Sequence, residues 1–286
     1  MRTLVESDQA SETTLSQSLG AHVALTLLSV RSQEAQAQGL PCQDYARVLS
    51  NETGSSISFC VCDGVGSSYY GGFAAQYLAT HLVEWLSGLE ALPAAPLEMS
   101  SCLEQWALQG QEELTQLPLP PATPVMLQGF LEELRDTHGS QAVFFGGRVD
   151  CNEEMLLDGF DAPFPGVRAL FYWMGNITTL IFAGEMQYKH LGDVQNDKNR
   201  WSTAKGPQGK LSARALTLKT LDRIFIYTDG LGAVGAELGA LNEYTLQTRI
   251  QELLALSATD DRTILDLRWG RASALESFSE KTRHDE

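Results

Sequence analysis

The stretch from Ser56 to Ser68, Ser-Ile-Ser-Phe-Cys-Val-Cys-Asp-Gly-Val-Gly-Ser-Ser, constrains this chain most, because it places a carboxylate at the tip of an apolar strand. A short, nearly continuous apolar run is typical of a buried strand. A charge at Asp63, at the end of such a strand, is costly unless it is paired. Gly64 and Gly66 let the backbone turn sharply and leave carbonyl oxygens open to a ligand. A hard cation such as Mg2+ or Mn2+ would satisfy this set of oxygens, and an ordinary Asp-Gly turn is the simpler alternative.

Composition limits the classes of partner and compartment. The net charge of −16 argues against nucleic acid and against an anionic membrane surface, because both would repel the chain. The five cysteines are scattered, and Cys60 and Cys62 are too close together for a zinc site, so we expect small core residues in a reducing compartment. The N-terminus lacks an apolar signal core, and no run approaches the length that spans a membrane. We therefore predict a cytoplasmic protein.

The pattern along the chain predicts one domain over residues 21–270, between polar tails at residues 1–20 and 271–286, the first of them a loose tail or a poorly held edge. The turn at residues 51–54 makes two neighbouring strands antiparallel, which places Asp44 and Asp63 at the same edge of a sheet. Residues 168–176 and 178–184 look like a strand pair with a tight turn, and residues 190–210 like a mobile flap. The other expected strands cover about 22–30, 44–50, 56–63, 141–149, 222–229 and 264–269, and the expected helices cover about 72–86, 101–117, 125–136 and 243–256.

The same signal recurs further along the chain. Residues 222–230 form a second apolar run that ends in Asp229-Gly230, and Asp260-Asp261 precedes the last strand. One carboxylate at a strand end is unremarkable, but its recurrence at several strand ends is informative.

In this order, these residues resemble the protein phosphatase 2C family, the metal-dependent Ser/Thr phosphatases. Within that family, the chain is similar to a bacterial-type member that stands alone. The resemblance covers roughly residues 22–270. It rests on five short motifs, which are Gln43-Asp44, Asp63-Gly64-Val65-Gly66, Gly175-Asn176, Thr228-Asp229-Gly230 and Asp260-Asp261-Arg262-Thr263.

The resemblance implies an α+β fold, a sandwich of two antiparallel β-sheets flanked by pairs of antiparallel helices, with two Mn2+ or Mg2+ ions at one end. By position, Asp63 would bridge both ions, Asp229 and Asp260 would complete one, and the Gly64 carbonyl would bind the other. Asp44 would act through coordinated water. Two divalent ions roughly 4 Å apart can activate a shared water for attack on a phosphate monoester. The implied function is a metal-dependent protein Ser/Thr phosphatase that acts on a phosphorylated protein, paired with a Ser/Thr kinase.

Three positions depart from the family pattern. Val65 stands where animal members often have histidine, Asn176 replaces a carboxylate associated with an additional metal, and no arginine precedes Gln43 to grip the phosphate. Basic residues that could substitute for the arginine are Arg31, Arg200 and Lys205.

Two rival interpretations remain at this stage. Gly230-Leu-Gly232-Ala-Val-Gly235 is a literal G-x-G-x-x-G after a strand, the fingerprint of a dinucleotide-binding fold. However, no acidic residue closes a second strand about 20 residues on. The other rival is a catalytically weak or dead phosphatase-like binding module, which the three departures favour and the four carboxylates oppose.

Overall fold

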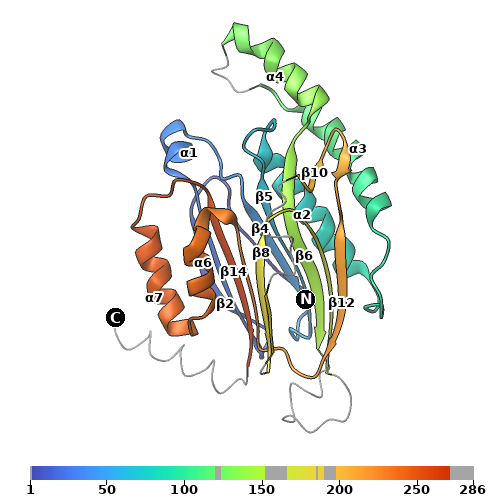
Figure 1. Cartoon of the computed structure of the whole chain (residues 1–286), viewed down its shortest axis with the longest axis vertical. Helices are drawn as coiled ribbons and strands as arrows, with labels where there is room; N and C mark the ends of the chain where they lie inside the picture. Colours follow the sequence, from blue (N-terminus) through green and yellow to red (C-terminus); the bar gives the residue numbers. More distant parts are fainter. Residues whose placement is uncertain (1, 120–123, 152–165, 185, 190–197, 271–286) are drawn as a thin grey trace.

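The computed structural model describes residues 2–119, 124–151, 166–184, 186–189 and 198–270, which build two antiparallel β-sheets stacked face to face (Figure 1). In the first sheet the path is β1 (Thr3–Glu6), β4 (Tyr45–Ser50), β5 (Ser56–Gly64), β6 (Gln141–Cys151), β10 (Arg200–Ser202) and β11 (Gly206–Gln208), and β7 (Val167–Met174) joins β6 to β12 (Ser212–Leu218). The second sheet has the order β2 (Thr13–Leu19), β3 (Val23–Val30), β14 (Arg262–Trp269), β13 (Arg223–Tyr227), β8 (Thr178–Ala183) and β9 (Met186–Lys189).

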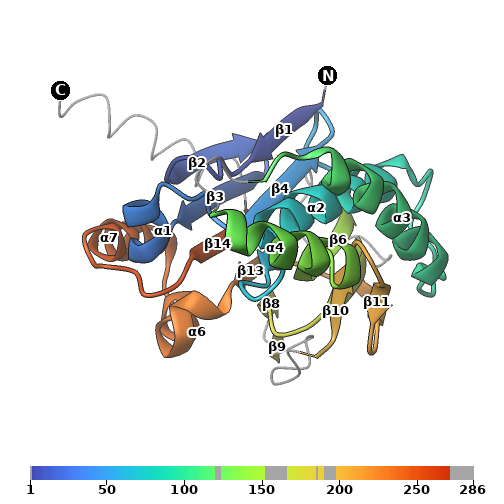
Figure 2. The same ribbon diagram turned by 90° about the horizontal axis from the view of Figure 1, so that it is seen from above.

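Helices cover the outer face of each sheet. The first sheet packs against α2 (Gly71–Gly88) and α3 (Ser100–Gln116), and the second against α6 (Gly232–Gly239) and α7 (Glu243–Leu254). Figure 2 shows these two pairs of helices on opposite sides of the sheets. This is the α+β sandwich that the family resemblance implies.

The strand pattern explains the layers. On β5, Phe59 and Val61 point into the core between the sheets, while Cys60 and Cys62 point toward α2. Successive side chains of a strand face opposite sides, so a nearly continuous apolar run is needed where both faces are covered. Both cysteines are fully buried thiols, in agreement with their predicted role as small core residues.

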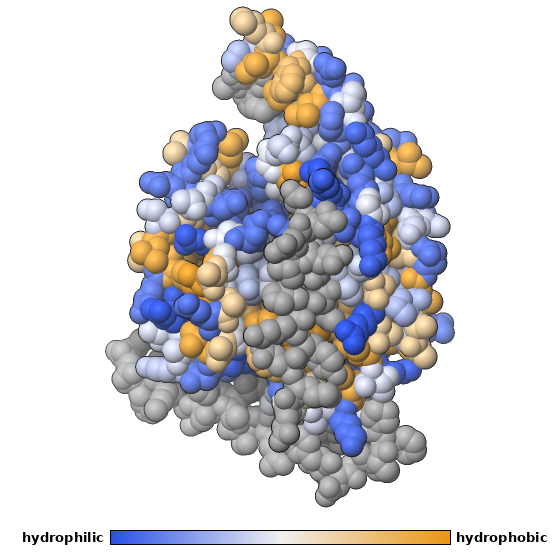
Figure 3. Space-filling view, in the orientation of Figure 1, coloured by the Kyte–Doolittle hydropathy of each residue, from blue (hydrophilic) through white to orange (hydrophobic). Residues whose placement is uncertain are grey.

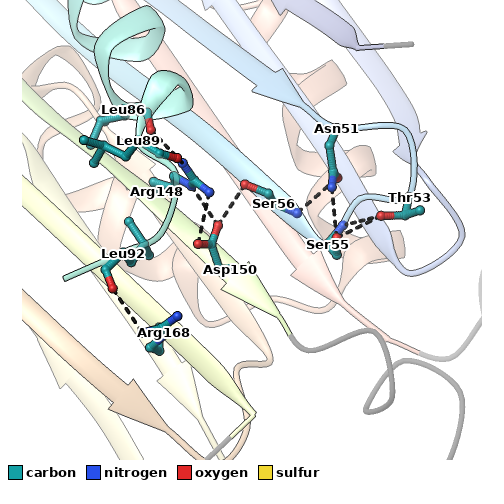
Figure 4. A network of polar contacts seen from close by, with 10 residues as sticks. All are labelled: Asn51, Thr53, Ser55, Ser56, Leu86, Leu89, Leu92, Arg148, Asp150 and Arg168. Atoms are coloured by element: carbon teal, nitrogen blue, oxygen red, sulfur yellow. Dashed lines mark hydrogen bonds and ion pairs between the residues drawn. The ribbon is translucent and has the colours of Figure 1, made fainter. Parts of the chain in front are cut away.

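The polar network in Figure 4 fastens the end of the first sheet that lies away from Asp63. Arg148 of β6 pairs with Asp150 at 2.7 Å and donates to the carbonyl oxygens of Leu86 and Leu89, at the C-terminal end of α2. Ser56, the first residue of β5, donates to the same carboxylate at 2.8 Å. At this end of the sheet, the charges of Arg148 and Asp150 are therefore paired, and the two side chains connect β5, β6 and the end of α2.

The expected hairpin between residues 168–176 and 178–184 is wrong. β7 pairs with β6 and β12 in the first sheet, whereas β8 pairs with β13 and β9 in the second. The turn between them carries the chain from one sheet to the other. Its residue Ile177 is 3% exposed and packs in the core between the sheets, and this burial holds the crossing in place. A local pattern cannot distinguish this crossing from a hairpin.

Other segments also differ from expectation. The N-terminal residues form edge strands, β1 on β4 and β2 on β3. Of the two predicted alternatives, the loose tail is therefore wrong and the sheet edge is correct. The part of the predicted flap that the structure describes, from residue 198, contains β10 and β11. Four further elements are not among those predicted from the sequence, namely β9, β12, α6 and α1 (Gln33–Gln38). The predicted tail at 271–286 lies outside the described residues.

The helix α4 (Val125–Thr137) projects from the body beyond α3, at the top of Figure 1. None of its residues is buried, and Val125, Met126 and Phe130 are largely exposed. Figure 3 shows hydrophobic surface at the top of the molecule, where α4 lies. Among the described helices, none is both long and apolar enough to cross a membrane.

Candidate active site

Four carboxylates that are distant in sequence meet at one end of the sandwich. Tyr45 is opposite Cys62 in the β4–β5 pair, so Asp44 and Asp63, one residue further out, are neighbours at the same sheet edge, as predicted. Asp229 follows the end of β13, and Asp260 precedes the start of β14. These two strand ends are adjacent, because Tyr227 of β13 pairs with Ile264 of β14. The charges of Asp44, Asp229 and Asp260 all act on the Asp63 carboxyl. The two sheets therefore bring together all four predicted aspartates.

The cluster has a buried floor and an open rim. Asp44 is 1% exposed, whereas Asp229 and Asp260 are exposed. Asp63 lies between them, with some solvent contact although protein atoms surround most of its carboxyl. A molecule from solvent can therefore reach the outer carboxylates.

Burial and mutual repulsion raise the proton affinity of these carboxyls. Burial raises the pKa of Asp44 to about 8, against hydrogen bonds from threonine hydroxyls that lower it. Burial, followed by the charges of Asp44, Asp229 and Asp260, raises the pKa of Asp63 well above its ordinary range. Burial and the Asp229 charge also raise the pKa of Asp260. Among the described residues, no lysine or arginine forms an ion pair with any of the four aspartates.

Thr228 joins the two sheets beneath the cluster. Its hydroxyl accepts the backbone N–H of Thr263 at 2.9 Å, so its proton is free to point to Asp44, whose Oδ2 lies 2.8 Å away. Thr228 belongs to the Thr228-Asp229-Gly230 motif, in which only Asp229 was predicted to take part in the site. A hydroxyl next to a strand-end aspartate was the available signal.

Asp261 plays a different part from its neighbour Asp260. It is 6% exposed, and its carboxylate accepts the backbone N–H of Ser32 at 2.6 Å and that of Gln43 at 2.5 Å. Both of its oxygens are thus used to hold loops together. Within the part of the chain that the structure describes, Asp260 accepts only from the N–H of Asp261, at 2.8 Å, so its carboxylate is less constrained than that of Asp261. This agrees with the choice of Asp260 as the candidate ligand.

Two close backbone contacts explain the glycines next to these aspartates. A Cβ at Gly230 would lie 1.9 Å from the carbonyl oxygen of Asp261, so the loop that carries Asp260 rests directly on this residue. A Cβ at Gly64 would lie 2.4 Å from the backbone carbon of Gly71 at the start of α2. Neither site has room for a side chain, and each glycine sets the spacing of the aspartate beside it.

Asn176 lies in the turn between β7 and β8, where the chain crosses from one sheet to the other. Its Nδ2 donates to Oδ2 of Asp229 at 2.9 Å. This residue is therefore more than a turn former, because it contacts one of the four aspartates. It faces Asp229 as a donor, in a place where a carboxylate would be repelled.

The donor set suits a hard divalent cation, since it consists of carboxylate oxygens that repel one another and lack a basic partner. Within the described ranges, however, no group of three or more His, Cys, Asp and Glu side chains is already arranged to hold a metal ion. The chemistry of the site fits Mg2+ or Mn2+, and binding would require the outer carboxylates to reorient.

The three basic candidates for phosphate binding lie at different places. Arg200 is next to Trp201, which pairs with Ala142 of β6, and Ala142 in turn pairs with Gly64. Arg200 is thus in the row of Asp63 two strands away, or roughly 10 Å at the usual strand spacing. Arg31 follows β3 and donates to the carbonyl oxygen of Leu40, and Lys205 lies in the turn between β10 and β11. Among these three, Arg200 is the one that shares a row with an aspartate of the cluster.

The dinucleotide interpretation of Gly230–Gly235 is wrong. β13, which precedes these glycines, pairs antiparallel with both of its neighbours, β14 and β8. A dinucleotide fold needs a parallel β-α-β unit at that point. The glycines serve packing instead, since a Cβ at Gly235 would lie 2.2 Å from the ring of Tyr227.

Comparisons with known proteins agree with this architecture. Residues 31–124 match the family model described as protein phosphatase 2C, and no curated protein matches the chain. Three similar solved structures share its fold. RsbX in complex with magnesium has a TM-score of 0.55 and 12% identity, covering 90% of this chain and 100% of that one. A bacterial serine phosphatase has a TM-score of 0.53 and 11% identity, covering 86% and 98%. The serine/threonine phosphatase Stp1 from Staphylococcus aureus has a TM-score of 0.51 and 12% identity, covering 89% and 98%.

Proposed function

We propose that the chain is a member of the protein phosphatase 2C family, whose model matches residues 31–124, and that it is a metal-dependent phosphomonoester hydrolase acting on phosphorylated serine or threonine. The observation that supports this most is the meeting of Asp44, Asp63, Asp229 and Asp260 from four separate segments. Keeping four like charges together is costly for a protein unless they serve a ligand. The proposal includes a phosphorylated protein as the substrate and a Ser/Thr kinase that phosphorylates it. It also includes a cytoplasmic location.

In the proposed site, Asp63, Asp229 and Asp260 would hold two Mg2+ or Mn2+ ions together with the carbonyl oxygen of Gly64. When bound, such ions supply Lewis acidity toward water and toward the phosphate oxygens. Asp44 would take part through water, because it lies at the buried floor and already accepts the Thr228 hydroxyl.

The remaining residues of the site orient these carboxylates. Thr228 fixes Oδ2 of Asp44 through its hydroxyl group. Asp261 holds the loop before β14 against the backbone of Gln43, which positions Asp260 beside Asp44 and Asp63. The exposure of Asp229 and Asp260 leaves the phosphate a path from solvent.

The decisive experiment is hydrolysis of p-nitrophenyl phosphate with Mn2+ or Mg2+ and with a chelator. Wild-type protein should turn over only with metal, and Asp63→Asn and Asp229→Asn should each lose nearly all turnover while they remain folded. Glu104→Gln, on the exposed side of α3, is the matched control for loss of one negative charge and should behave like wild type. Equal rates with metal and with chelator would refute the proposal.

A second candidate is a phosphatase-shaped binding module without turnover. The specific observation in its favour is that, among the described residues, no three carboxylate, histidine or cysteine side chains are arranged so that they could hold a metal ion. Calorimetry distinguishes the two functions, since an enzyme should bind Mn2+ at a site that Asp63→Asn removes, whereas a module that has lost its metal site should show no difference.

A further inference from the structure

A small cavity opens between α2 and α3, apart from the carboxylate cluster. Its volume is about 240 Å³, and it is lined by Phe73, Gln76, Tyr77, Thr80, His81 and Glu113. The five residues from α2 follow the spacing of three and four that places side chains on one helical face. Small-molecule sites usually exceed about 300 Å³, so this cavity suits a single side chain better than a whole cofactor.

Aromatic rings form one wall of this cavity. The rings of Phe73 and Tyr77 are stacked with centroids 5.6 Å apart, and the Tyr77 and His81 rings are 4.3 Å apart. Behind them, Trp201 is stacked on Tyr77 at 6.1 Å and Trp106 on His81 at 5.8 Å. These contacts hold the rings in place. The face of an aromatic ring attracts a cation.

The charge around the cavity favours a cation as well. Glu113 is exposed, and within the described residues its carboxylate forms no ion pair. Residues 71–134 contain eight glutamates and no lysine, arginine or aspartate. Burial lowers the pKa of His81, which keeps its ring neutral, and Arg47 beside it is already paired with Glu6 and Glu84. The wall and rim thus offer negative charge and aromatic faces that no cation of this helical layer occupies.

The cavity lies close to the candidate active site. Gly71 begins α2 directly against Gly64, since a Cβ on Gly71 would be 2.8 Å from the Gly64 carbon. Tyr77 is six residues further along the helix, or about 9 Å at a rise of 1.5 Å per residue. An extended peptide advances about 3.3 Å per residue. A side chain in the cavity would therefore stand roughly three to six residues from a phosphoserine at the carboxylates.

We propose that this cavity binds an arginine side chain of the phosphorylated protein segment, and so selects substrates with arginine at a fixed distance from the phosphorylated residue. This inference rests on the proposed phosphatase function. A guanidinium group can stack on the partly exposed ring of Phe73 and at the same time pair with Glu113. Lysine fits less well, because its compact ammonium group cannot stack in this way.

The test is a series of phosphoserine peptides in which one arginine occupies each position from three to six residues on either side of the phosphoserine. For each peptide, kcat/KM is divided by that of the peptide with glutamine at the same position. Wild-type protein should show a ratio of about ten at one or two neighbouring positions. Glu113→Gln and Phe73→Leu should each reduce this ratio to below about three, whereas Glu104→Gln should leave it unchanged.

Hydrolysis of p-nitrophenyl phosphate separates this inference from the function on which it rests, because that substrate has no side chain for the cavity. All three variants should hydrolyse it like wild type. A wild-type enzyme that hydrolyses it but gains nothing from arginine at any position overturns the inference, and so does an arginine preference that survives Glu113→Gln. If wild type does not hydrolyse it, the proposed function fails. The cavity is then tested by fluorescence anisotropy of the unphosphorylated arginine peptide, where Glu113→Gln should raise Kd about tenfold. An unchanged Kd would overturn the inference.

Discussion

Replacing the neighbouring aspartates 260 and 261 one at a time should have opposite consequences. Asp261→Ala removes the acceptor of two partly buried backbone N–H groups, those of Ser32 and Gln43, at 2.6 and 2.5 Å. Leaving a fully buried donor unsatisfied costs about 1–3 kcal/mol, so about 6 kcal/mol is the upper limit for the two together. The lost charge offsets part of this, because Asp261 repels Asp44. We expect a net loss of about 2–4 kcal/mol in the free energy of unfolding.

Asp260→Ala should cost little stability. Its side chain is exposed and, among the described residues, accepts a hydrogen bond only from the N–H of Asp261. Removing its charge also relieves repulsion with Asp229. We expect a change of less than about 1 kcal/mol, in either direction, together with loss of metal-dependent turnover.

Urea unfolding with a chelator present measures both variants without a contribution from bound metal. Activity toward p-nitrophenyl phosphate is measured beside it. Asp261→Asn completes the series, since its amide keeps one acceptor oxygen but turns a donor toward the second N–H. A chelated Asp261→Ala protein as stable as wild type would refute this reasoning, and so would an Asp260→Ala protein with normal turnover.

Three further predictions follow from the same site. Asn176→Asp replaces a hydrogen-bond donor to Asp229 with a carboxylate. It should lower stability when metal is chelated and reduce the metal concentration that gives half-maximal rate. Superimposable metal titrations of the two proteins would show that Asn176 contributes its hydrogen bond but does not affect metal binding. Arg200→Met should raise KM for a phosphopeptide several-fold with little change in melting temperature, and an unchanged KM would exclude Arg200 as a phosphate ligand. The folded pKa of Asp44, about 8, exceeds the ordinary value of 3.8, so the folded chain binds this proton more tightly than the unfolded chain. Its stabilising contribution is complete below about pH 4 and is lost as pH rises through about 8. The urea midpoint of chelated protein should therefore fall over this interval, and more steeply than in Asp44→Asn.

Much of the architecture could be predicted from local pattern. The apolar run before Asp63 specified a strand covered on both faces, and the helical spacing of residues 72–86 specified α2. The turn at residues 51–54 fixed the register of β4 and β5, and with it the meeting of Asp44 and Asp63. These features depend on neighbours in sequence, which is why a single chain reveals them.

The resemblance to a known family supplied what the pattern could not, namely that Asp229 and Asp260 join the same cluster. Local periodicity places each of them at a strand end but does not say which ends are adjacent. The same limit explains the error at β7 and β8, where burial of Ile177 between the sheets, rather than the turn sequence, decides that the chain crosses.

The sequence by itself determined most of the long strands and helices and the carboxylates at the strand ends, because these depend on periodicity and on the conformational preferences of single residues. Only the tertiary structure decided what each carboxylate does. Asp260 and Asp261 are identical side chains in adjacent positions, yet one is exposed at the rim and the other is buried under two backbone N–H groups. The cavity between α2 and α3 likewise needs Glu113 to meet a helix face 32 residues earlier in the chain. Such contacts arise from the packing of distant segments, and packing is settled only when the whole chain folds.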